Sequence, residues 1–221
     1  MAWIDTIFSA FKGGEATRVP LSQGYAAGLS ADWLKQLDIA DRCDFEYTGA
    51  VRQSFLSNPI AQRAVRIVAE GIAQTPLLSG QNELTKLVGA TSAGQSLIET
   101  LTAHVLLHGN GFVQVVKDAS NTPVELFALR PDRVRIVPDD KGWPCAVDYC
   151  IGAQQQRIAL DDEEGWPNII HIKALHPLED HYGAGALAAA YQAVKIHNAA
   201  SGWNRALLEN AARPSGALVY D

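Results

Sequence analysis

The stretch that decides the fold spans residues 91–138 and reads TSAGQSLIETLTAHVLLHGNGFVQVVKDASNTPVELFALRPDRVRIVP. Its first part places apolar residues at three- and four-residue spacing, which is the period of one helix face. The residues at that spacing are Leu97, Leu101, Val105 and His108, with Ile98 and Leu106 beside them. We therefore predict a helix that ends near residue 108. A side-chain oxygen of Thr91 or Ser92 is expected to cap its start.

The second part of the stretch changes to strand character. Gly109 follows the last periodic position, where a left-handed helix end suits glycine. At least one of Gly109 and Gly111 is expected to have a positive φ, because the chain must leave a helix and enter a strand within a few residues. Runs rich in β-branched residues then predict strands at residues 112–116, 124–129 and 134–137, separated by turn residues.

Helices are also predicted on either side of this stretch. Asn58 is a good cap and Pro59 suits the first helical position, while Pro76 ends the helix. The side chains expected to be buried on this helix are Ile60, Ala64, Ile67, Val68 and Ile72. Arg63 and Arg66 lie off that stripe, which favours a solvated face or a local ion pair over contact with nucleic acid. A long helix at residues 185–212 would measure about 40 Å.

Shorter elements complete the prediction. Residues 77–78 can begin a short strand and residues 83–88 a short helix. Two similar acidic turns that end in Gly-Trp-Pro, at residues 139–144 and 161–167, precede strands at 146–151 and 168–175. We interpret both turns as solvated turn chemistry, because adjacent carboxylates in a turn point in different directions. A last strand is expected at residues 217–220.

The chain divides into an N-terminal arm and a body. In residues 1–45, one helical face gathers apolar side chains and a glycine-containing flexible arm follows. The apolar face consists of Trp3, Ile4, Ile7, Phe8 and Phe11. Asp5 interrupts the run, which argues against a signal peptide and favours a short helix that docks on this protein or on a neighbouring copy. Residues 46–221 are expected to form one α+β body with a mixed or antiparallel sheet.

The composition excludes several classes of protein. A formal net charge of −6 is unlike a module that grips phosphates through a basic surface. Hydrophobic residues make up 48% of the chain and charged residues 19%, which is ordinary for a globular protein. The three cysteines, Cys43, Cys145 and Cys150, form neither a disulfide framework nor a zinc spacing. No apolar run is long enough to span a bilayer, so no membrane partner is expected.

No strong catalytic motif is present. There is no P-loop, no G-x-S-x-G elbow and no H-E-x-x-H, and the glycines at 109 and 111 lack the spacing of a dinucleotide loop. The one cluster with chemical potential is His171, His176 and His181 with Glu179 and Asp180, since imidazoles and carboxylates together can hold zinc. We interpret His171 as an ordinary strand residue. No catalytic, cofactor-binding or metal residue is assigned, and no cofactor is expected.

The ordered set of these segments resembles the HK97-like portal proteins of tailed phages. The resemblance begins with NPIAQRAVRIVAEGIAQTPLL and continues through LLHGNGFVQVV and ELFALRPDRVRIV. It ends with IIHIKAL and GAGALAAAYQAVKIHNAASGWNRALLENAARPSGAL, so that it covers residues 58–218. It implies a wing-like α+β body with packing helices and one long C-terminal helix. The histidine of the IIHIKAL strand has no metal role in that family.

The resemblance also implies a function. Portal subunits form a twelve-membered ring at one capsid vertex, and double-stranded DNA passes through its channel without sequence specificity. The partners implied are other copies of the chain, the terminase motor, the capsid and the head–tail adaptor proteins. The expected location is the virion, with assembly in the host cytoplasm, and no catalysis is expected. Two alternatives remain at this point: a metal-dependent hydrolase that uses His171, His176 and His181, and another α+β virion adaptor protein.

Members of the resembled family continue well past the position matched by Leu218. We therefore expect residues 1–221 to be the N-terminal portion of a portal and to hold mainly its outer, wing-like body. Such a chain is expected to fold but not to close into a stable ring by itself.

Overall fold

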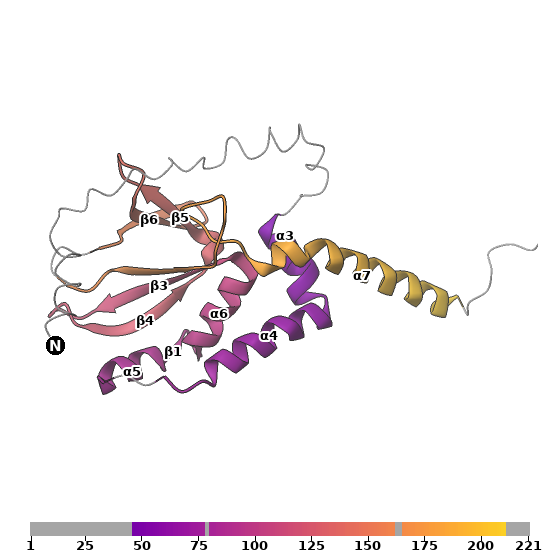
Figure 1. Cartoon of the computed structure of the whole chain (residues 1–221), viewed down its shortest axis with the longest axis horizontal. Coiled ribbons are helices and arrows are strands. Elements are labelled where there is room, and N and C mark those ends of the chain that lie inside the picture. The colour runs from indigo at the N-terminus through magenta and orange to yellow at the C-terminus, as the bar shows by residue number, and fades with distance from the viewer. Residues whose placement is uncertain (1–45, 78–79, 162–164, 211–221) are drawn as a thin grey trace, which may run out of the picture.

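The computed structural model describes residues 46–77, 80–161 and 165–210 (Figure 1). Helices and antiparallel strands share these residues, which confirms the α+β class. The elements, in chain order, are α3 (Tyr47–Val51), a π-helical turn η2 (Arg52–Leu56), α4 (Pro59–Ala73), α5 (Asn82–Val88), β1 (Thr91–Ser92), β2 (Gln95–Ser96), α6 (Leu97–His108), β3 (Asn110–Lys117), β4 (Pro123–Leu129), a 3-10 turn η3 (Pro131–Arg133), β5 (Val134–Pro138), β6 (Pro144–Ile151), β7 (Gln154–Ala159), β8 (Ile169–Lys173) and α7 (Ala186–Glu209).

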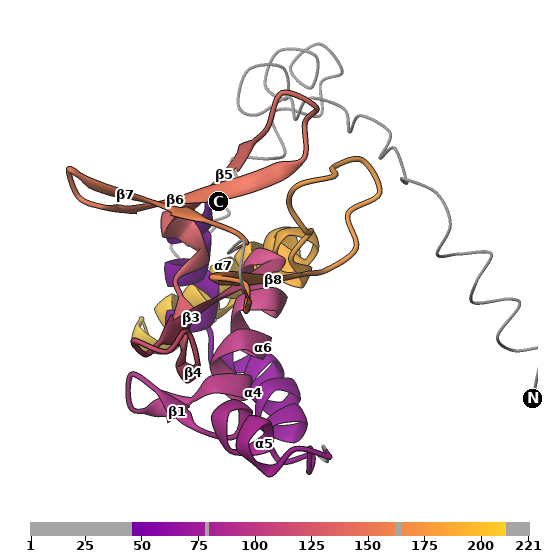
Figure 2. The same ribbon diagram turned by 90° about the vertical axis from the view of Figure 1, so that its left-hand side faces the viewer.

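Two three-stranded antiparallel sheets form one end of the molecule. Their strand orders are β4-β3-β8 and β5-β6-β7. The core between them takes residues from both sheets, namely Phe112, Leu129 and Ile169 from the first and Val134 and Val147 from the second. Figure 2 shows the strands β5, β6 and β7 on one side of β3 and β4, with helices α4, α5 and α6 on the other side. The sheets therefore hold each other through one shared apolar layer.

Helix α6 covers the other face of the first sheet. Leu97 and Leu101 pack against Val113 of β3, with Leu126 and Ala128 of β4 beside them. Because side chains alternate along a strand, Phe112 faces the second sheet while Val113 faces α6. Strand β3 is thus covered on both faces, and this explains why apolar residues occupy both faces of its central part, with Phe112 on one and Val113 and Val115 on the other.

A second helical cluster forms where α6 ends. Leu107 of α6, Ala50 of α3 and Leu187 of α7 are buried together, with Phe55 and Val65 packed against them. From this corner α7 extends away from the body, as Figure 1 shows. The body consequently has three apolar clusters, of which two include residues of β3 and two include residues of α6.

The start of α6 differs from the prediction. The capping residue is Ser96, whose Oγ lies 3.4 Å from the backbone nitrogen of Glu99. Thr91 and Ser92 instead form strand β1, which pairs with β2 in a short antiparallel hairpin. Ser92 Oγ accepts a hydrogen bond of 2.9 Å from the Ala128 nitrogen. The prediction of a cap at Thr91 or Ser92 was wrong, because a contact with β4 draws this segment into an extended conformation.

The buried face of α4 also differs from the prediction. Ile60 is 63% exposed, Ile67 54% and Ile72 49%, whereas Ala69 is only 2% exposed. The helix packs Val65 and Ala69 toward α6 and η2, where small side chains let the helices approach. The apolar stripe was identified correctly, but its assignment to the core was wrong, since a periodic stripe does not reveal which partner covers it.

The remaining differences concern polar or short segments. Strand β7 was not predicted because GAQQQRIA lacks apolar alternation, and α3 and η2 lie in a stretch without a clear pattern. Leu77 is not in a strand. The other predicted strands and helices agree to within three residues at each described end. The expected helix at 1–12, the arm at 13–31 and the strand at 217–220 lie outside the described residues.

Candidate assembly surface

The turn from α6 into β3 is packed backbone against backbone with the segment before α7. Gly109 has a φ of +87°, which confirms that one of the two glycines takes a left-handed conformation. Its carbonyl oxygen accepts a 2.8 Å hydrogen bond from the Ala174 nitrogen. A Cβ on Gly109 would overlap Gly183, and a Cβ on Gly183 would overlap the carbonyl oxygens of Gly109 and Ala174. We call this contact, residues 109–111 with 183–185, the glycine junction.

Asn110 is the polar centre of the glycine junction and is 1% exposed. Its Oδ1 accepts a 2.8 Å hydrogen bond from the Gly183 nitrogen and lies 3.0 Å from His171 Nε2. Its Nδ2 lies 3.1 Å from His108 Nδ1. One side chain therefore links the end of α6, strand β8 and the approach to α7, which fixes the start of α7 on the body.

The three histidines that the sequence offered as possible metal ligands lie in different environments. His171 stacks on Phe112 with ring centroids 4.3 Å apart, and burial lowers its pKa to about 4. His176 Nδ1 accepts a 3.2 Å hydrogen bond from the Leu178 nitrogen, while His181 is 4% exposed. Among the described residues, no group of three or more histidine, cysteine or acidic side chains is arranged to hold a metal.

The middle of α7 is held by polar contacts to the helical corner. Asn58, which caps α4 through its Oδ1, also donates from Nδ2 to Asn198 Oδ1 at 2.7 Å and lies 2.9 Å from His197 Nδ1. Asn198 in turn donates to the Gln53 carbonyl oxygen at 2.7 Å. Asn198 is thus the last α7 residue with a hydrogen bond to another described element.

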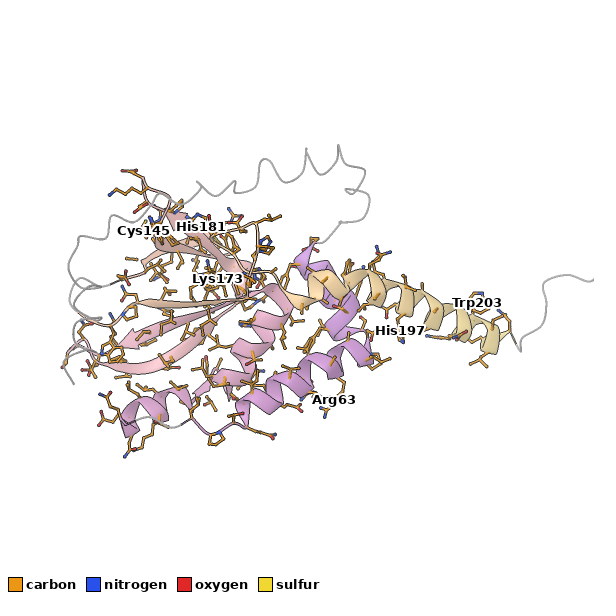
Figure 3. The ribbon with its side chains drawn as sticks, in the orientation of Figure 1. Arg63, Cys145, Lys173, His181, His197 and Trp203 are labelled. Carbon is orange, nitrogen blue, oxygen red and sulfur yellow. The ribbon has the colours of Figure 1, made fainter. Side chains whose placement is uncertain are left out.

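Beyond this anchor α7 projects from the body with apolar side chains uncovered. Trp203 is 66% exposed and Leu208 80%, and Figure 3 shows Trp203 near the far end of the helix. We call Trp203, Leu207 and Leu208 the α7 end. The outer α4 face consists of Ile60, Ile67, Val68 and Ile72, each at least 43% exposed. Large exposed apolar side chains grouped on rigid helices mark interaction surfaces.

The basic residues of α4 are neutralised locally. Arg63 and Arg66 both contact Glu70, with N···O distances of 3.0 and 3.2 Å. This confirms the interpretation of a local ion pair and leaves the outer α4 face without a concentrated positive charge. The face is therefore suited to an apolar protein partner more than to phosphates.

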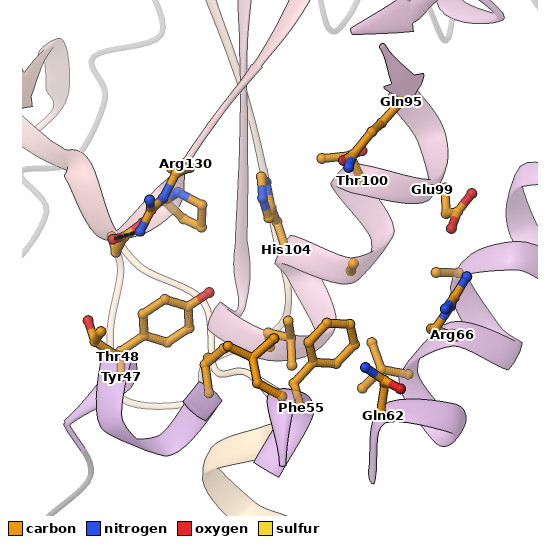
Figure 4. Close-up of a pocket in the computed structure, with 18 of the residues that line it drawn as sticks. Tyr47, Thr48, Phe55, Gln62, Arg66, Gln95, Glu99, Thr100, His104 and Arg130 are labelled. Atoms are coloured by element: carbon orange, nitrogen blue, oxygen red, sulfur yellow. Dashed lines mark hydrogen bonds and ion pairs between the residues drawn. The ribbon is translucent and has the colours of Figure 1, made fainter. Parts of the chain in front are cut away.

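A pocket of about 720 Å³ lies on the inner side of α4, between α3, η2, α6 and η3 (Figure 4). Its walls include Val51, Phe55 and Leu107. At one end, Arg130 forms two hydrogen bonds to Asp132, 3.1 and 2.6 Å long. His104 lines the pocket, and its Nδ1 is buried without a hydrogen-bond partner among the described residues. We call this cavity the helical pocket.

The comparison with known families identifies the chain. A sequence model of the family described as phage portal protein matches residues 59–221. The chain belongs to the phage portal protein family. The portal resemblance predicted from the sequence is thereby confirmed. Within the described residues, no helix is both long and apolar enough to cross a membrane.

Solved structures extend this comparison. A chain in the virion of a native gene transfer agent (GTA) particle is 40% identical with a TM-score of 0.69, and the match covers 79% of this chain and 48% of that one. A chain in the neck of a native GTA particle, determined with C12 symmetry, gives the same identity and TM-score over 80% of this chain and 49% of that one.

A curated relative, an uncharacterized protein of Rickettsia bellii (strain RML369-C), is 29% identical over 75% of this chain. This portal-family chain spans about half the length of the relatives it matches, 46% in the case of the Rickettsia bellii protein.

Sequence reasoning found the residues of the outer α4 face but not their role. Their spacing was visible as an amphipathic stripe, and the same stripe suits a core or an interface. The helical pocket was missed, because its walls come from six elements, α3, η2, α4, β2, α6 and η3, whose packing no local pattern shows.

Proposed function

We propose that this chain is part of a structural portal subunit that assembles with other copies into a ring through which genomic DNA is packaged and ejected. The observation that carries the proposal is the exposure of the outer α4 face and the α7 end on a chain 40% identical to one in a C12-symmetric GTA neck. Neighbouring copies in such a ring would cover apolar side chains that a lone chain leaves in water.

The proposed partners follow from the same role. Besides copies of itself, they are double-stranded DNA without sequence specificity, the terminase motor, the capsid and head–tail adaptor proteins. The location is the portal vertex of the virion after assembly in the host cytoplasm. A formal net charge of −6 supports a channel component over a phosphate-gripping protein, because DNA must slide past it.

The proposed role is structural and involves no catalysis. In support of it, the His171 ring lies within hydrogen-bond distance of Asn110 and stacks on Phe112, and His176 accepts a hydrogen bond from a backbone nitrogen. Elemental analysis of the purified protein checks this proposal directly. We expect no stoichiometric zinc, and one tightly held equivalent would favour the hydrolase alternative instead.

A chimera tests the portal proposal. Residues 59–210 of this chain replace the matching part of the GTA neck chain in the producing cells, and particles are counted by electron microscopy and by nuclease-protected DNA. We expect DNA-containing particles. A chimera that is soluble and melts cooperatively but yields none would overturn the proposal.

A pair of variants of the chimera tests the surface. Ile67→Asp places a charge on the outer α4 face and is expected to abolish assembly. Gln192→Asp adds the same charge at an exposed polar position of α7 and is expected to leave assembly intact. Equal yields from both would show that the outer α4 face does not mediate ring contacts.

A further inference from the structure

We propose that the helical pocket receives residues 3–11 of the same chain, which dock there through their apolar side chains. This inference does not depend on ring assembly. It rests on the shape and lining of the pocket, on the composition of the N-terminal sequence, and on the place where the chain joins the body.

The lining of the pocket suits an apolar occupant with a polar edge. Its apolar part is contributed by four helical elements, through Val51 of α3, Phe55 of η2, Val65 and Ala69 of α4, and Ala103 and Leu107 of α6. Figure 4 shows His104 on α6 and Phe55 on the facing helical segment. A volume of about 720 Å³ holds several large side chains, and pockets of this size typically bind mostly apolar groups with a few placed polar contacts.

His104 is a half-buried polar residue in the α6 wall of the pocket. Its Nδ1 is buried and has no hydrogen-bond partner among the described residues. That nitrogen has almost no solvent-accessible surface, so an occupant of the pocket does not reach it and the docking relies on the apolar lining.

Residues 3–11 have the matching chemistry. Their sequence, WIDTIFSAF, includes Trp3, Phe8 and Phe11, and Asp5 is the one charged residue in the segment. With Ile4 and Ile7 these aromatic residues lie on one face at helical spacing. Aromatic side chains that enter a pocket and leave water supply most of the binding energy of such contacts.

The tether favours docking within one copy. The described body begins at Glu46, and the next residues, Tyr47 and Thr48, already line the pocket. The described body therefore begins at the rim of the pocket. For a random-coil linker with as many residues as separate residue 12 from Glu46, the average span is about 30 Å, which corresponds to an effective concentration on the order of millimolar. A free partner must exceed that concentration to compete.

Photo-cross-linking in the full chain tests the docking. Phe8 is replaced by p-benzoylphenylalanine, and equal amounts of 14N- and 15N-labelled protein are mixed and irradiated. We expect cross-links to residues 47–56 and 97–107, with both peptides of one isotope. Cross-links to the outer α4 face, or pairs of mixed isotope in their statistical share, would overturn the proposal.

A matched pair of variants gives an independent readout. Ala103→Phe fills the pocket, whereas Ala64→Phe places the same ring on the exposed side of α4. Hydrogen exchange of residues 3–11 is expected to quicken at least tenfold in A103F and to stay at the wild-type rate in A64F. Thr100→Trp, which fills the pocket from another turn of α6, should repeat the result of A103F if that variant folds poorly. Wild-type protection in both pocket variants would refute the docking.

Discussion

The glycine junction and the outer α4 face differ in almost every physical respect. At the junction, Asn110 is 1% exposed and its amide is fully engaged, and the backbones of Gly109 and Gly183 touch. On the outer α4 face, Ile60 is 63% exposed and its side chain lies in water. The junction can accept no additional atom, whereas the outer face has apolar surface that folding has not covered.

This difference separates stability from assembly. Substitutions at the junction act on the folded state of the isolated chain, because they create overlap or unpaired buried groups there. Substitutions on the outer α4 face leave the isolated chain nearly as stable and act on whatever partner covers that face.

Glycine-to-valine substitutions at the junction should have the largest effect. Gly109→Val and Gly183→Val should each lower the free energy of unfolding by at least about 3 kcal/mol, since the added atoms overlap backbone and Gly109 needs a positive φ. Urea denaturation measures this loss. Gly202→Ala in α7, where an added Cβ meets nothing within 4 Å, serves as the control and should be neutral or slightly stabilising. Wild-type stability of the two junction variants would refute the packing described for them.

Removing the amide of Asn110 should have the next largest effect. Asn110→Leu leaves the Gly183 N–H and the His171 ring nitrogen without their partner, and we expect a loss of about 2–3 kcal/mol. Thermal melting and denaturant titration report it. Asn210→Leu, at the exposed end of α7, should change stability by less than about 0.5 kcal/mol. Equal losses in the two variants would contradict the special role of Asn110.

Stability should fall in mild acid. Burial lowers the pKa of His104 and that of His171 to about 4 from the ordinary value of 6.5. The unfolded chain therefore binds more protons between pH 6.5 and 4, so stability is full above pH 6.5 and declines as the pH falls through this window. The melting temperature measured from pH 7.5 to 4 checks this. His171→Asn should flatten the decline, and an unchanged slope in that variant would show that the pKa of His171 is the same in the folded and unfolded states.

Substitutions at two nearby positions of α4 should lower the free energy of unfolding by clearly different amounts. Val65 packs into the helical corner while Ile67 is 54% exposed. Val65→Ala should lower stability by about 1–2 kcal/mol, and Ile67→Ala by less than about 0.5 kcal/mol despite removing more atoms. Denaturant midpoints compare the two directly. A larger loss for Ile67→Ala would mean that the outer α4 face is covered within the isolated chain.

The smallest effect is expected at the ion pairs of α4. Glu70→Gln removes the negative charge that pairs with Arg63 and Arg66, whose side chains are 62% and 54% exposed. Solvent screens such pairs, so we expect a change of at most about 0.5 kcal/mol that disappears in high salt. A melting curve at two salt concentrations is sufficient, and a loss above about 1 kcal/mol would point to an additional contact of Glu70.

The sequence by itself determined the element types and their order wherever one local rule acts alone. Asn58 and Pro59 start α4 and Gly109 ends α6 because capping and left-handed turns are decided within a few residues. The apolar runs of β3, β4, β5, β6 and β8 showed their strands for the same reason. The ordered set of segments was specific enough to indicate the portal family.

Only the tertiary structure decided which faces are covered. Ser92 joins β1 because Ala128 of β4 offers a backbone donor, and the stripe of Ile60 and Ile67 points outward because α6 packs on the other side of α4. The helical pocket and the glycine junction join residues tens of positions apart. Contacts of that kind depend on how layers stack, and local periodicity carries no information about the partner that a face will meet.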